Sequence, residues 1–471
     1  MPDVLGDNQQ DAARGAEGRR RGSMTTTTAA RGTRRPDRAL QARVVVLAAV
    51  AVNLVIVELL FAAHGAGQNQ VLTVANFAGL HAALIMMGQL LLVARLPWLD
   101  RRIGMDRLTA WHRWTGFTLF WAVLAHASLV VAGFAVLDSA SPLRTFASLL
   151  GVPASLLGMI AATLLAAVAV TSIRLARRRA SYEAWHALHL VAYLAVLAAL
   201  VHQWLEGTTF TASPLGVAYW AALWTFTLVA LVSGRLVIPL RRNALHQLRV
   251  AAVVPESDNV VSIHVTGQHL DRLRARAGQF FIWRFPGHNP WWQANPFSLS
   301  AAPDGTSLRL TVKATGTTSA GLRHLEPGTR VFAEGPYGAF THHRRTRDAL
   351  LLIAGGVGIT PIRALLEEAT GPVVVLYRVR TEDDAVLLPE LNALAAAKGA
   401  QLHLLTGRTG TGTPPRQPLD PAPLRALVPD IHDRDVFVCG PPAMTRAVLR
   451  SLRSLKVPSR QVHSERFGFA G

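Results

Sequence analysis

Cysteine is almost absent from this chain of 471 residues: Cys439 is the only one. A single cysteine excludes an intramolecular disulfide, and it excludes a zinc or iron–sulfur site built on cysteines. Lysine is scarce as well, limited to Lys313, Lys398 and Lys456, so arginine carries most of the formal charge of +19. The arginines cluster beside hydrophobic segments rather than on one compact module, and we therefore exclude nucleic acid as a partner.

Hydrophobic residues make up 50% of the chain, with a mean hydropathy of +0.27, but the two halves differ. Up to about Leu240 long apolar runs dominate, whereas beyond it apolar and polar residues alternate as in a globular α/β protein. Six runs are each close to the roughly 20 residues that a membrane-spanning helix needs. They are residues 43–63, 73–93, 111–136, 152–173, 185–205 and 215–238. The sequence therefore predicts a multi-pass protein of the lipid bilayer.

Arginine clusters lie on alternate sides of these runs. The rich side comprises Arg31, Arg34, Arg35, Arg38, Arg95, Arg101, Arg102, Arg107, Arg174, Arg177, Arg178, Arg179, Arg235, Arg241 and Arg242. The opposite loops at 64–72 and 206–214 have no arginine or lysine, and the loop between the third and fourth runs has only Arg144. By the positive-inside rule, both termini are predicted to be cytoplasmic, with the protein in the plasma membrane.

The first 42 residues are polar and basic, with no apolar period, and we predict a disordered cytoplasmic tail. Either Met1 or Met24 could be the true start. No cleavable-signal pattern precedes the first run, which is longer than the apolar part of a signal peptide.

Two histidine pairs lie in the third and fifth runs: His112 with His126, and His189 with His202. Histidine is expensive in hydrocarbon, so one located there usually has a partner or a metal. The separations are 14 (126 − 112) and 13 (202 − 189) residues, which is about 20 Å at about 1.5 Å per residue. Since the two helices are predicted to be parallel, His112 can face His189 at one depth, and His126 can face His202 at another. Two stacked bis-histidine haems require this arrangement.

Some alternatives stay open for the histidines. At about 100° per residue, 14 residues return to within about 40° of one helix face, but 13 miss it by about 140°. Either the haems are offset around the fifth helix or that helix is locally distorted. A single buried histidine can also be a structural hydrogen bonder, and His186 competes with His189. His81 and His64 lack matching partners, and we interpret His81 as structural.

From about residue 243 the pattern changes to short strands separated by turn residues, which is typical of a small antiparallel barrel. The expected strands are 247–254, 260–266, 279–285, 307–313 and 330–334. After Asp348 strands alternate with helices, at 349–354, 373–377, 401–405 and 435–439, which predicts an α/β nucleotide-binding domain. We expect a multidomain membrane protein with a tail at 1–42, a six-helix transmembrane bundle at 43–240, a β-barrel domain at 243–345 and an α/β domain at 346–471.

A glycine-rich loop, Gly355-Gly356-Val357-Gly358-Ile359-Thr360-Pro361, follows the first strand of the α/β domain. Glycines allow a close backbone approach, and the free amides at a helix start attract phosphate. We expect Thr360 to be the N-cap and Pro361 the first helical residue. Arg363 opposes the helix dipole, which either a bound anion or a solvated surface position would explain.

Six motifs in order resemble the ferredoxin-reductase-type FAD/NAD(P) module. They are Asn-Pro-Phe-Ser (295–298), Lys-x-x-Gly-x-x-Ser (313–319), Gly-Pro-Tyr-Gly (335–338), Gly-Val-Gly-Ile-Thr-Pro (356–361), Cys-Gly-Pro-Pro-x-Met (439–444) and Glu-Arg-Phe-Gly-Phe (465–469). Joined to the six spans and four histidines, the chain resembles the ferric reductase and NADPH oxidase flavocytochromes over about residues 43–471. The resemblance implies FAD in the barrel, a nicotinamide nucleotide in the α/β domain and two b-type haems.

The resemblance also implies roles for single residues. The haem irons would be held by His112, His126, His189 and His202. Cys439 would lie by the nicotinamide ring and Phe469 would stack on the isoalloxazine. The flavin or the nicotinamide nucleotide would be bound by Asn295, Pro296, Phe297, Ser298, Lys313, Gly316, Ser319, Gly356, Gly358, Thr360, Pro361, Gly440 and Pro441. Arg380 and Arg408 are candidates for a 2′-phosphate, slightly favouring NADPH, although both are equally consistent with a surface position.

Two positions depart from the family pattern. Asn295 stands where these reductases and oxidases usually have histidine; it adds no cationic charge, so weaker FAD binding is expected. Val130 stands where the oxidases have a further histidine, one turn beyond the outer ligand. The valine disfavours oxygen as a dedicated acceptor.

The implied activity is electron transfer from cytoplasmic NAD(P)H through FAD and two haems to an acceptor on the outer side. Bis-histidine ligation leaves no open iron position, so the acceptor would react at the haem edge. Two alternatives stay open: a membrane-anchored NAD(P)H flavoprotein reductase with a cytoplasmic or quinone acceptor, and a non-catalytic haem-binding membrane protein. The external acceptor, the choice of NADH or NADPH and the oligomeric state are left open by the sequence.

Overall fold

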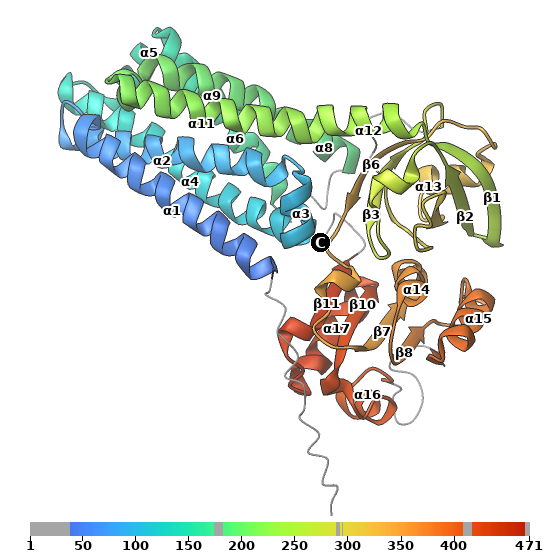
Figure 1. The fold of residues 1–471 in the computed structure, drawn as a ribbon. Helices are drawn as coiled ribbons and strands as arrows, with labels where there is room; N and C mark the ends of the chain where they lie inside the picture. The colour runs from blue at the N-terminus through green and yellow to red at the C-terminus, as the bar shows by residue number, and fades with distance from the viewer. Residues whose placement is uncertain (1–37, 174–181, 289–292, 294, 408–416, 467–471) are drawn as a thin grey trace, which may run out of the picture. The chain divides into compact units, whose positions relative to one another are not determined.

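The computed structural model describes residues 38–173, 182–288, 293, 295–407 and 417–466 (Figure 1). Within these ranges, six helical segments are long and apolar enough to span a membrane, which confirms the six predicted spans. They are Leu40–His64, Gln70–Val93, Arg107–Leu137, Pro153–Ser172, Ala184–Glu206 and Pro214–His246. The protein is therefore a multi-pass membrane protein.

The spans pack alongside one another as a bundle (Figure 1). α2 (Gln70–Val93) lies along α4 (Met105–Leu137), and α6 (Pro153–Ser172) lies along α9 (Ala192–Glu206). The remaining helices of this half are α1 (Arg38–His64), α3 (Pro97–Ile103), α5 (Pro142–Leu150), α8 (Tyr182–Leu190), α10 (Thr208–Thr211), α11 (Pro214–Val232) and α12 (Ile238–His246). A helix satisfies its backbone groups internally, so its apolar side chains can face lipid.

Local sequence explains where two of the spans begin. The side chain of Asn69 accepts a hydrogen bond from the Leu72 amide at 2.8 Å and caps α2. Ser213 caps α11 in the same way, and Pro214 occupies the first helical position, where no amide donor is needed.

The fifth span is interrupted at Val191, between α8 and α9. The amide of Val191 donates to the carbonyl oxygen three residues earlier, at 3.1 Å, and so tightens the turn. His189 lies on α8 and His202 on α9. Of the two alternatives for the 13-residue spacing, the structure therefore shows the local distortion.

The sixth span extends further than its apolar run. α11 continues through a π-helical turn at Ser233–Val237 into α12, which ends at His246 rather than near residue 240. Pro239, in the first turn of α12, has no amide hydrogen to donate. An inserted residue in the turn before a proline is a common way for a helix to continue past it.

The domain after the bundle consists of two three-stranded antiparallel sheets, ordered β1-β2-β5 and β4-β3-β6. The strands are β1 (Arg249–Ser257), β2 (Val260–Thr266), β3 (Phe280–Arg284), β4 (Asn295–Ser298), β5 (Ser307–Lys313) and β6 (Phe332–Tyr337), with the short helix α13 (Thr317–Gly321) after β5. The expected barrel is not confirmed: in the described residues the two sheets are open, joined by isolated bridges at Arg249–Arg330 and Leu299–Leu310 and by a shared hydrophobic cluster.

The last domain is the predicted α/β domain, with a five-stranded parallel sheet ordered β11-β10-β7-β8-β9. Its elements are β7 (Ala349–Gly355), α14 (Ile359–Glu368), β8 (Val373–Arg378), α15 (Leu388–Lys398), β9 (Gln401–Leu405), α16 (Pro421–Leu427), β10 (Arg434–Gly440), α17 (Pro442–Ser454) and β11 (Val462–Arg466). The expectation that Thr360 caps α14 is wrong. Gly358 is the N-cap, and the Thr360 hydroxyl, inside the first turn, donates to the Val357 carbonyl at 3.1 Å.

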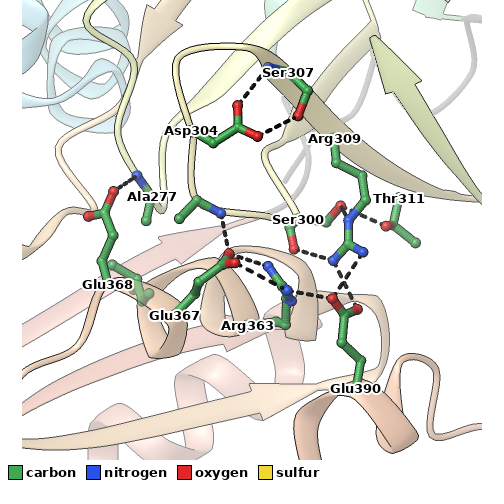
Figure 2. A network of polar contacts seen from close by, with 12 residues as sticks. Ala277, Ser300, Asp304, Ser307, Arg309, Thr311, Arg363, Glu367, Glu368 and Glu390 are labelled. Carbon is green, nitrogen blue, oxygen red and sulfur yellow. Dashed lines mark hydrogen bonds and ion pairs between the residues drawn. The ribbon is translucent and has the colours of Figure 1, made fainter. Parts of the chain in front are cut away.

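A network of ion pairs connects β5 to helices α14 and α15 (Figure 2). Arg309 on β5 binds both carboxylate oxygens of Glu390, at 3.1 and 3.0 Å. Arg363 on α14 pairs with Glu390 and with Glu367, whose carboxylate also accepts the Ala302 amide at 2.6 Å. Arg363 is thus buried against carboxylates, and neither a bound anion nor a solvated position explains it.

Replacing Glu390 by Ala should destabilise the soluble half, because the buried Arg363 and Arg309 lose a shared counter-ion. Removing one partner of a buried ion pair costs about 3–5 kcal/mol of stability. Because Glu390 is one-third exposed, we expect a loss at the lower end of that range or less. It should appear as a drop of several degrees in the melting temperature of the purified protein. Glu382→Ala, an exposed acid of the same domain, is the matched control. Equal melting temperatures for both variants would contradict this role of the network.

Candidate functional site

The four predicted histidines form two facing pairs inside the bundle. The ring centroids of His112 on α4 and His189 on α8 are 6.1 Å apart, with an angle of 69° between the ring planes. Those of His126 on α4 and His202 on α9 are 6.3 Å apart, at 61°. The ring that faces His112 is therefore that of His189, three residues after its competitor His186.

Both centroid separations fit two imidazoles that share one metal ion. A metal–imidazole bond of about 2 Å, as for zinc, plus about 1 Å from nitrogen to ring centre on each side, gives about 6 Å. Among the described residues, no group of three or more His, Cys, Asp or Glu side chains is arranged to hold a metal ion. Two imidazoles on opposite sides are the donor set of a bis-histidine haem, whose macrocycle supplies the other ligands.

The pair formed by His126 and His202, which the predicted orientation makes the outer pair, is oriented by backbone carbonyls. Nδ1 of His126 lies 2.8 Å from the Ala75 carbonyl oxygen, and Nδ1 of His202 lies 2.8 Å from that of Ala154. A carbonyl oxygen can only accept, so each Nδ1 carries the hydrogen and each Nε2 keeps a lone pair. Hydrogen bonds of this kind fix the tautomer and the ring orientation of metal-ligating histidines.

Two glycines make room for the outer imidazoles, and the sequence analysis missed both. A Cβ atom on Gly79 of α2 would lie 2.7 Å from Cε1 and Nδ1 of His126. One on Gly158 of α6 would lie 2.9 Å from the same atoms of His202. Any larger residue would have to displace a ring, because such distances are far below van der Waals contact.

The inner pair has different surroundings. The side-chain amide of Gln89 on α2 donates to the backbone carbonyl of His112 at 2.9 Å. Nδ1 of His112 is buried and has no hydrogen-bond partner in the described part of the chain. The ring of Trp185 lies 5.1 Å from that of His189, tilted by 30°. Within the described residues, the His112 ring is therefore not oriented through Nδ1, unlike the rings of His126 and His202.

Polar contacts tie the inner end of the bundle to strand β6. The carboxylate of Asp100 on α3 accepts the Gly338 amide at 2.8 Å, and Arg95 forms an ion pair with Glu334. The Asn243 side chain bonds both the carbonyl and the amide of Ala333, each at 2.8 Å.

These contacts fix the Gly-Pro-Tyr-Gly motif, since Gly338 is its last residue. Burial raises the pKa of Tyr337, in the same motif, to about 12, so its phenol stays protonated at neutral pH. The motif is therefore held directly against the membrane-spanning half.

The other predicted flavin residues lie on β4 and beyond β5. Asn295 is buried, and its side-chain amide donates to the Trp283 carbonyl at 3.3 Å. Pro296 and Phe297 are half-buried and Ser298 is buried. The Ser319 hydroxyl accepts the amides of Thr315 and Gly316, at 2.9 and 3.1 Å, and so shapes the turn after Lys313.

A cleft of about 740 Å³ lies at the carboxyl ends of β7, β8 and β10. Five predicted residues line it: Lys313, Gly356, Gly358, Arg380 and Pro441. Thr315, Gly355, Val357 and Met444, which also line it, belong to motifs named in the sequence, whereas the sequence analysis missed Arg378, Val379, Asp384, Val386 and Gly407. The strand order reverses between β7 and β10, and nucleotides bind at such a switch point.

Several predicted residues do not line this cleft but are buried next to the residues that do. Cys439 and Thr360 are buried. A Cβ atom on Gly358 would lie 2.4 Å from the Cys439 carbonyl oxygen, so only glycine permits this close approach of loop and strand. Pro361 is buried in the first turn of α14, and Gly440 ends β10. Arg408 and Phe469 lie outside the described residues.

The charges at the cleft are mostly positive. Arg378, at the end of β8, donates to the carbonyl oxygens of Val379 and Leu405, at 2.8 and 2.9 Å. Partial burial lowers the pKa of the Arg378 guanidinium from its ordinary value. Hydrogen bonds from Thr381 lower the pKa of Asp384, the carboxylate in the lining, so it is ionised at neutral pH.

Three family models match successive parts of the chain. They are the ferric reductase like transmembrane component at residues 78–200, the FAD-binding domain at 245–341 and the oxidoreductase NAD-binding domain at 352–450.

Curated relatives match the soluble half. The ferredoxin reductase component of 3-ketosteroid-9-alpha-monooxygenase from Mycobacterium tuberculosis is 33% identical over 240 residues, which is 47% of this chain and 65% of the relative. The chain thus spans just under two thirds of that relative. Ferredoxin–NADP reductase B from Sorangium cellulosum is 31% identical over 191 residues, 36% of this chain and 77% of the relative.

Among solved structures, the FAD/NAD-binding domain of nitric oxide dioxygenase from Vibrio cholerae O1 biovar El Tor is 25% identical. It covers 47% of this chain and 99% of that one, with a TM-score of 0.40.

Gly79→Ala and Gly158→Ala should each weaken haem binding at the outer pair, because the added methyl group would overlap the His126 or His202 ring. We expect a lower haem-to-protein ratio and the loss of one component in a redox titration. Gly88→Ala is the matched control, since a Cβ atom at this other glycine of α2 has no neighbour within 4 Å. Identical titrations for Gly79→Ala and Gly88→Ala would refute the steric role of Gly79.

Proposed function

Because the chain belongs to the ferric-reductase-like membrane flavoproteins, which join a ferric reductase like transmembrane component to FAD-binding and NAD-binding domains, we propose that it carries electrons across the membrane. The route would run from cytoplasmic NAD(P)H through FAD and two b-type haems to an acceptor on the outer side. The observation that supports this proposal most directly is that four imidazoles face each other in two pairs, at two depths of one bundle. A membrane anchor alone would need neither pair.

Bound flavin would convert a two-electron hydride into single electrons, which bound haems can pass on. The protein's own part is placement. Four imidazoles would hold the irons, and the carbonyls of Ala75 and Ala154 orient two of them. Asp100 and Asn243 fix β6 against the inner end of the bundle. Gly356 and Gly358 of the loop after β7 line the cleft next to the start of α14, where helix amides favour a pyrophosphate. Hydride transfer needs stacking and distance, with no general acid or base.

We favour NADPH as the donor because of the residues that follow β8. In doubly wound sheets an acid about 20 residues after the glycine loop bonds the ribose hydroxyl of NAD, whereas arginine accommodates the 2′-phosphate of NADP. Arg378 lies 20 residues after Gly358 (378 − 358), and Arg380 lies two residues further. Both line the cleft.

Replacing His202 by Ala should remove the outer haem and leave the inner one, so the haem-to-protein ratio should fall by about half. NADPH should still reduce the remaining haem, as read from a reduced-minus-oxidised spectrum, while reduction of an external acceptor stops. His186→Ala is the matched control, because the His189 ring, and not that of His186, faces His112. Full haem content in His202→Ala would exclude that residue as a ligand.

Replacing Arg380 by Ala should raise the KM for NADPH and leave that for NADH unchanged, since only NADPH carries the 2′-phosphate. A hydrogen bond to a charged group contributes about 1.5–3 kcal/mol, which corresponds to a change of about 10- to 100-fold. Steady-state kinetics with both nucleotides measure the ratio. Arg323→Ala, whose guanidinium bonds the Asp258 carbonyl away from the cleft, is the control. An unchanged NADPH-to-NADH preference would argue against Arg380 as the phosphate ligand.

A further inference from the structure

A second pair of ionisable side chains lies in the bundle, apart from the four paired histidines. Nε2 of His81 on α2 is 3.1 Å from Oε1 of Glu58 on α1. The two side chains are 20% and 48% exposed on the flank of the bundle. Both residues lie inside membrane-spanning segments, so the face they are exposed on is the one that meets lipid.

A structural tie between α1 and α2 does not account for this pair. An ionisable side chain inside the bilayer is unfavourable by several times what one interhelical hydrogen bond contributes. Such residues therefore usually face the bundle interior and mark a functional path. Glu58 instead has about half of its side chain exposed to lipid.

The hydrogen bonds of His81 indicate where its hydrogens lie. Its Nδ1 lies 2.8 Å from the Phe77 carbonyl oxygen, which can only accept, so Nδ1 carries a hydrogen. Nε2 and the Glu58 carboxylate then hold one proton between them. Aromatic rings lie next to His81: the centroid of the Phe77 ring is 4.2 Å from that of the His81 ring, and the centroid of Phe61 is 5.2 Å from that of Phe77.

The pair lies at the depth of the outer histidines, across one helix. His81 is 11 residues from the start of α2 (81 − 70), and His126 is 11 residues from the end of α4 (137 − 126), about 16 Å in each case. Ala75 and Gly79 of α2 contact His126. Phe77 and His81, each two residues further along, point about 200° away. Only α2, about 10–12 Å wide, separates the two sites.

We propose that Glu58, His81 and Phe77 form a lipid-facing site for the headgroup of a membrane quinone, and that this quinone accepts the electrons. The inference rests on the proposed function. A quinone reaches the site through lipid, its flat ring can lie against Phe77, and its carbonyl oxygens accept hydrogen bonds. A charged, water-soluble metal chelate does not enter hydrocarbon.

The reaction is a balanced reduction: one quinone takes up two electrons and two protons and becomes the quinol. Each carbonyl C=O becomes C–OH. The electrons derive from the nicotinamide nucleotide and arrive one at a time. Each proton passes through the His81–Glu58 pair, which is reprotonated from water at the outer surface.

The test uses the full chain, loaded with FAD and haem, in phosphatidylcholine nanodiscs. The haems are reduced anaerobically with one equivalent of dithionite and mixed with ubiquinone-1, and haem reoxidation is followed by stopped flow. Glu58→Gln and His81→Gln should slow reoxidation by about 100-fold, as expected for the loss of a positioned proton donor. Reoxidation by ferricyanide should not change. His64→Gln, a histidine at the outer end of α1, should behave like wild type with both acceptors.

Two outcomes would overturn the site without touching the proposed function: reoxidation of the wild type by ferricyanide but not by ubiquinone-1, or equal ubiquinone-1 rates in all variants. Haems that NADPH cannot reduce, but that ubiquinone-1 reoxidises after dithionite, would instead overturn the proposed function and keep the site. A photoreactive azidoquinone supplies a readout independent of turnover. Its label should map to α1 and α2 and be lost in His81→Gln; a label elsewhere contradicts the site.

Discussion

The facing imidazoles of α4 and of the fifth span are the constraint on which the rest of the protein depends. A histidine in hydrocarbon needs a partner, and each of these four has a second imidazole, with ring centroids at 6.1 or 6.3 Å. Two such pairs at two depths go with an interruption at Val191 between the two histidines of the fifth span, and with neighbouring helices that have no side chain at Gly79 and Gly158. The helices of the bundle thus pack around two pairs of imidazole rings.

In the half of the chain after the bundle, contacts between domains are again important, because hydride and electron transfer depend on the distance and orientation of the reacting groups. Asp100 and Asn243 form hydrogen bonds to β6 and to Gly338 directly after it, and so join the Gly-Pro-Tyr-Gly motif to the bundle. Glu390 joins Arg309 to Arg363 and thereby fixes the nucleotide-binding domain against β5 (Figure 2). Apolar contacts accompany the polar ones at both junctions: Ala277 and Phe340 belong to the core of the α/β domain, and Met105 of α4 packs against Phe280, Ile282 and Tyr337.

Sequence patterns predicted the features that depend on local order. The lengths of the apolar runs predicted the six membrane spans, and the turn residues between shorter apolar runs predicted most of the strands. The 13-residue spacing predicted that the fifth helix could be distorted, but not that it breaks at Val191. Long-range packing could not be predicted from the sequence. The absence of a Cβ atom at Gly79, for example, is important only because the His126 ring of α4 lies against this position. For the same reason the sequence left Arg363 open between a bound anion and a solvated surface position, since its partner Glu390 comes from another helix.

The central claim is that electrons cross the bilayer, and trapped acceptor tests it most directly. The full chain, with FAD and haem, is reconstituted in liposomes that enclose ferricyanide, and NADPH is added outside under anaerobic conditions. Molecules whose nucleotide-binding domain faces outward should bleach the enclosed ferricyanide, and His202→Ala should abolish the bleaching while flavin reduction continues. Oxidation of NADPH with the enclosed ferricyanide unchanged would contradict the account and leave a reductase that is only anchored in the membrane.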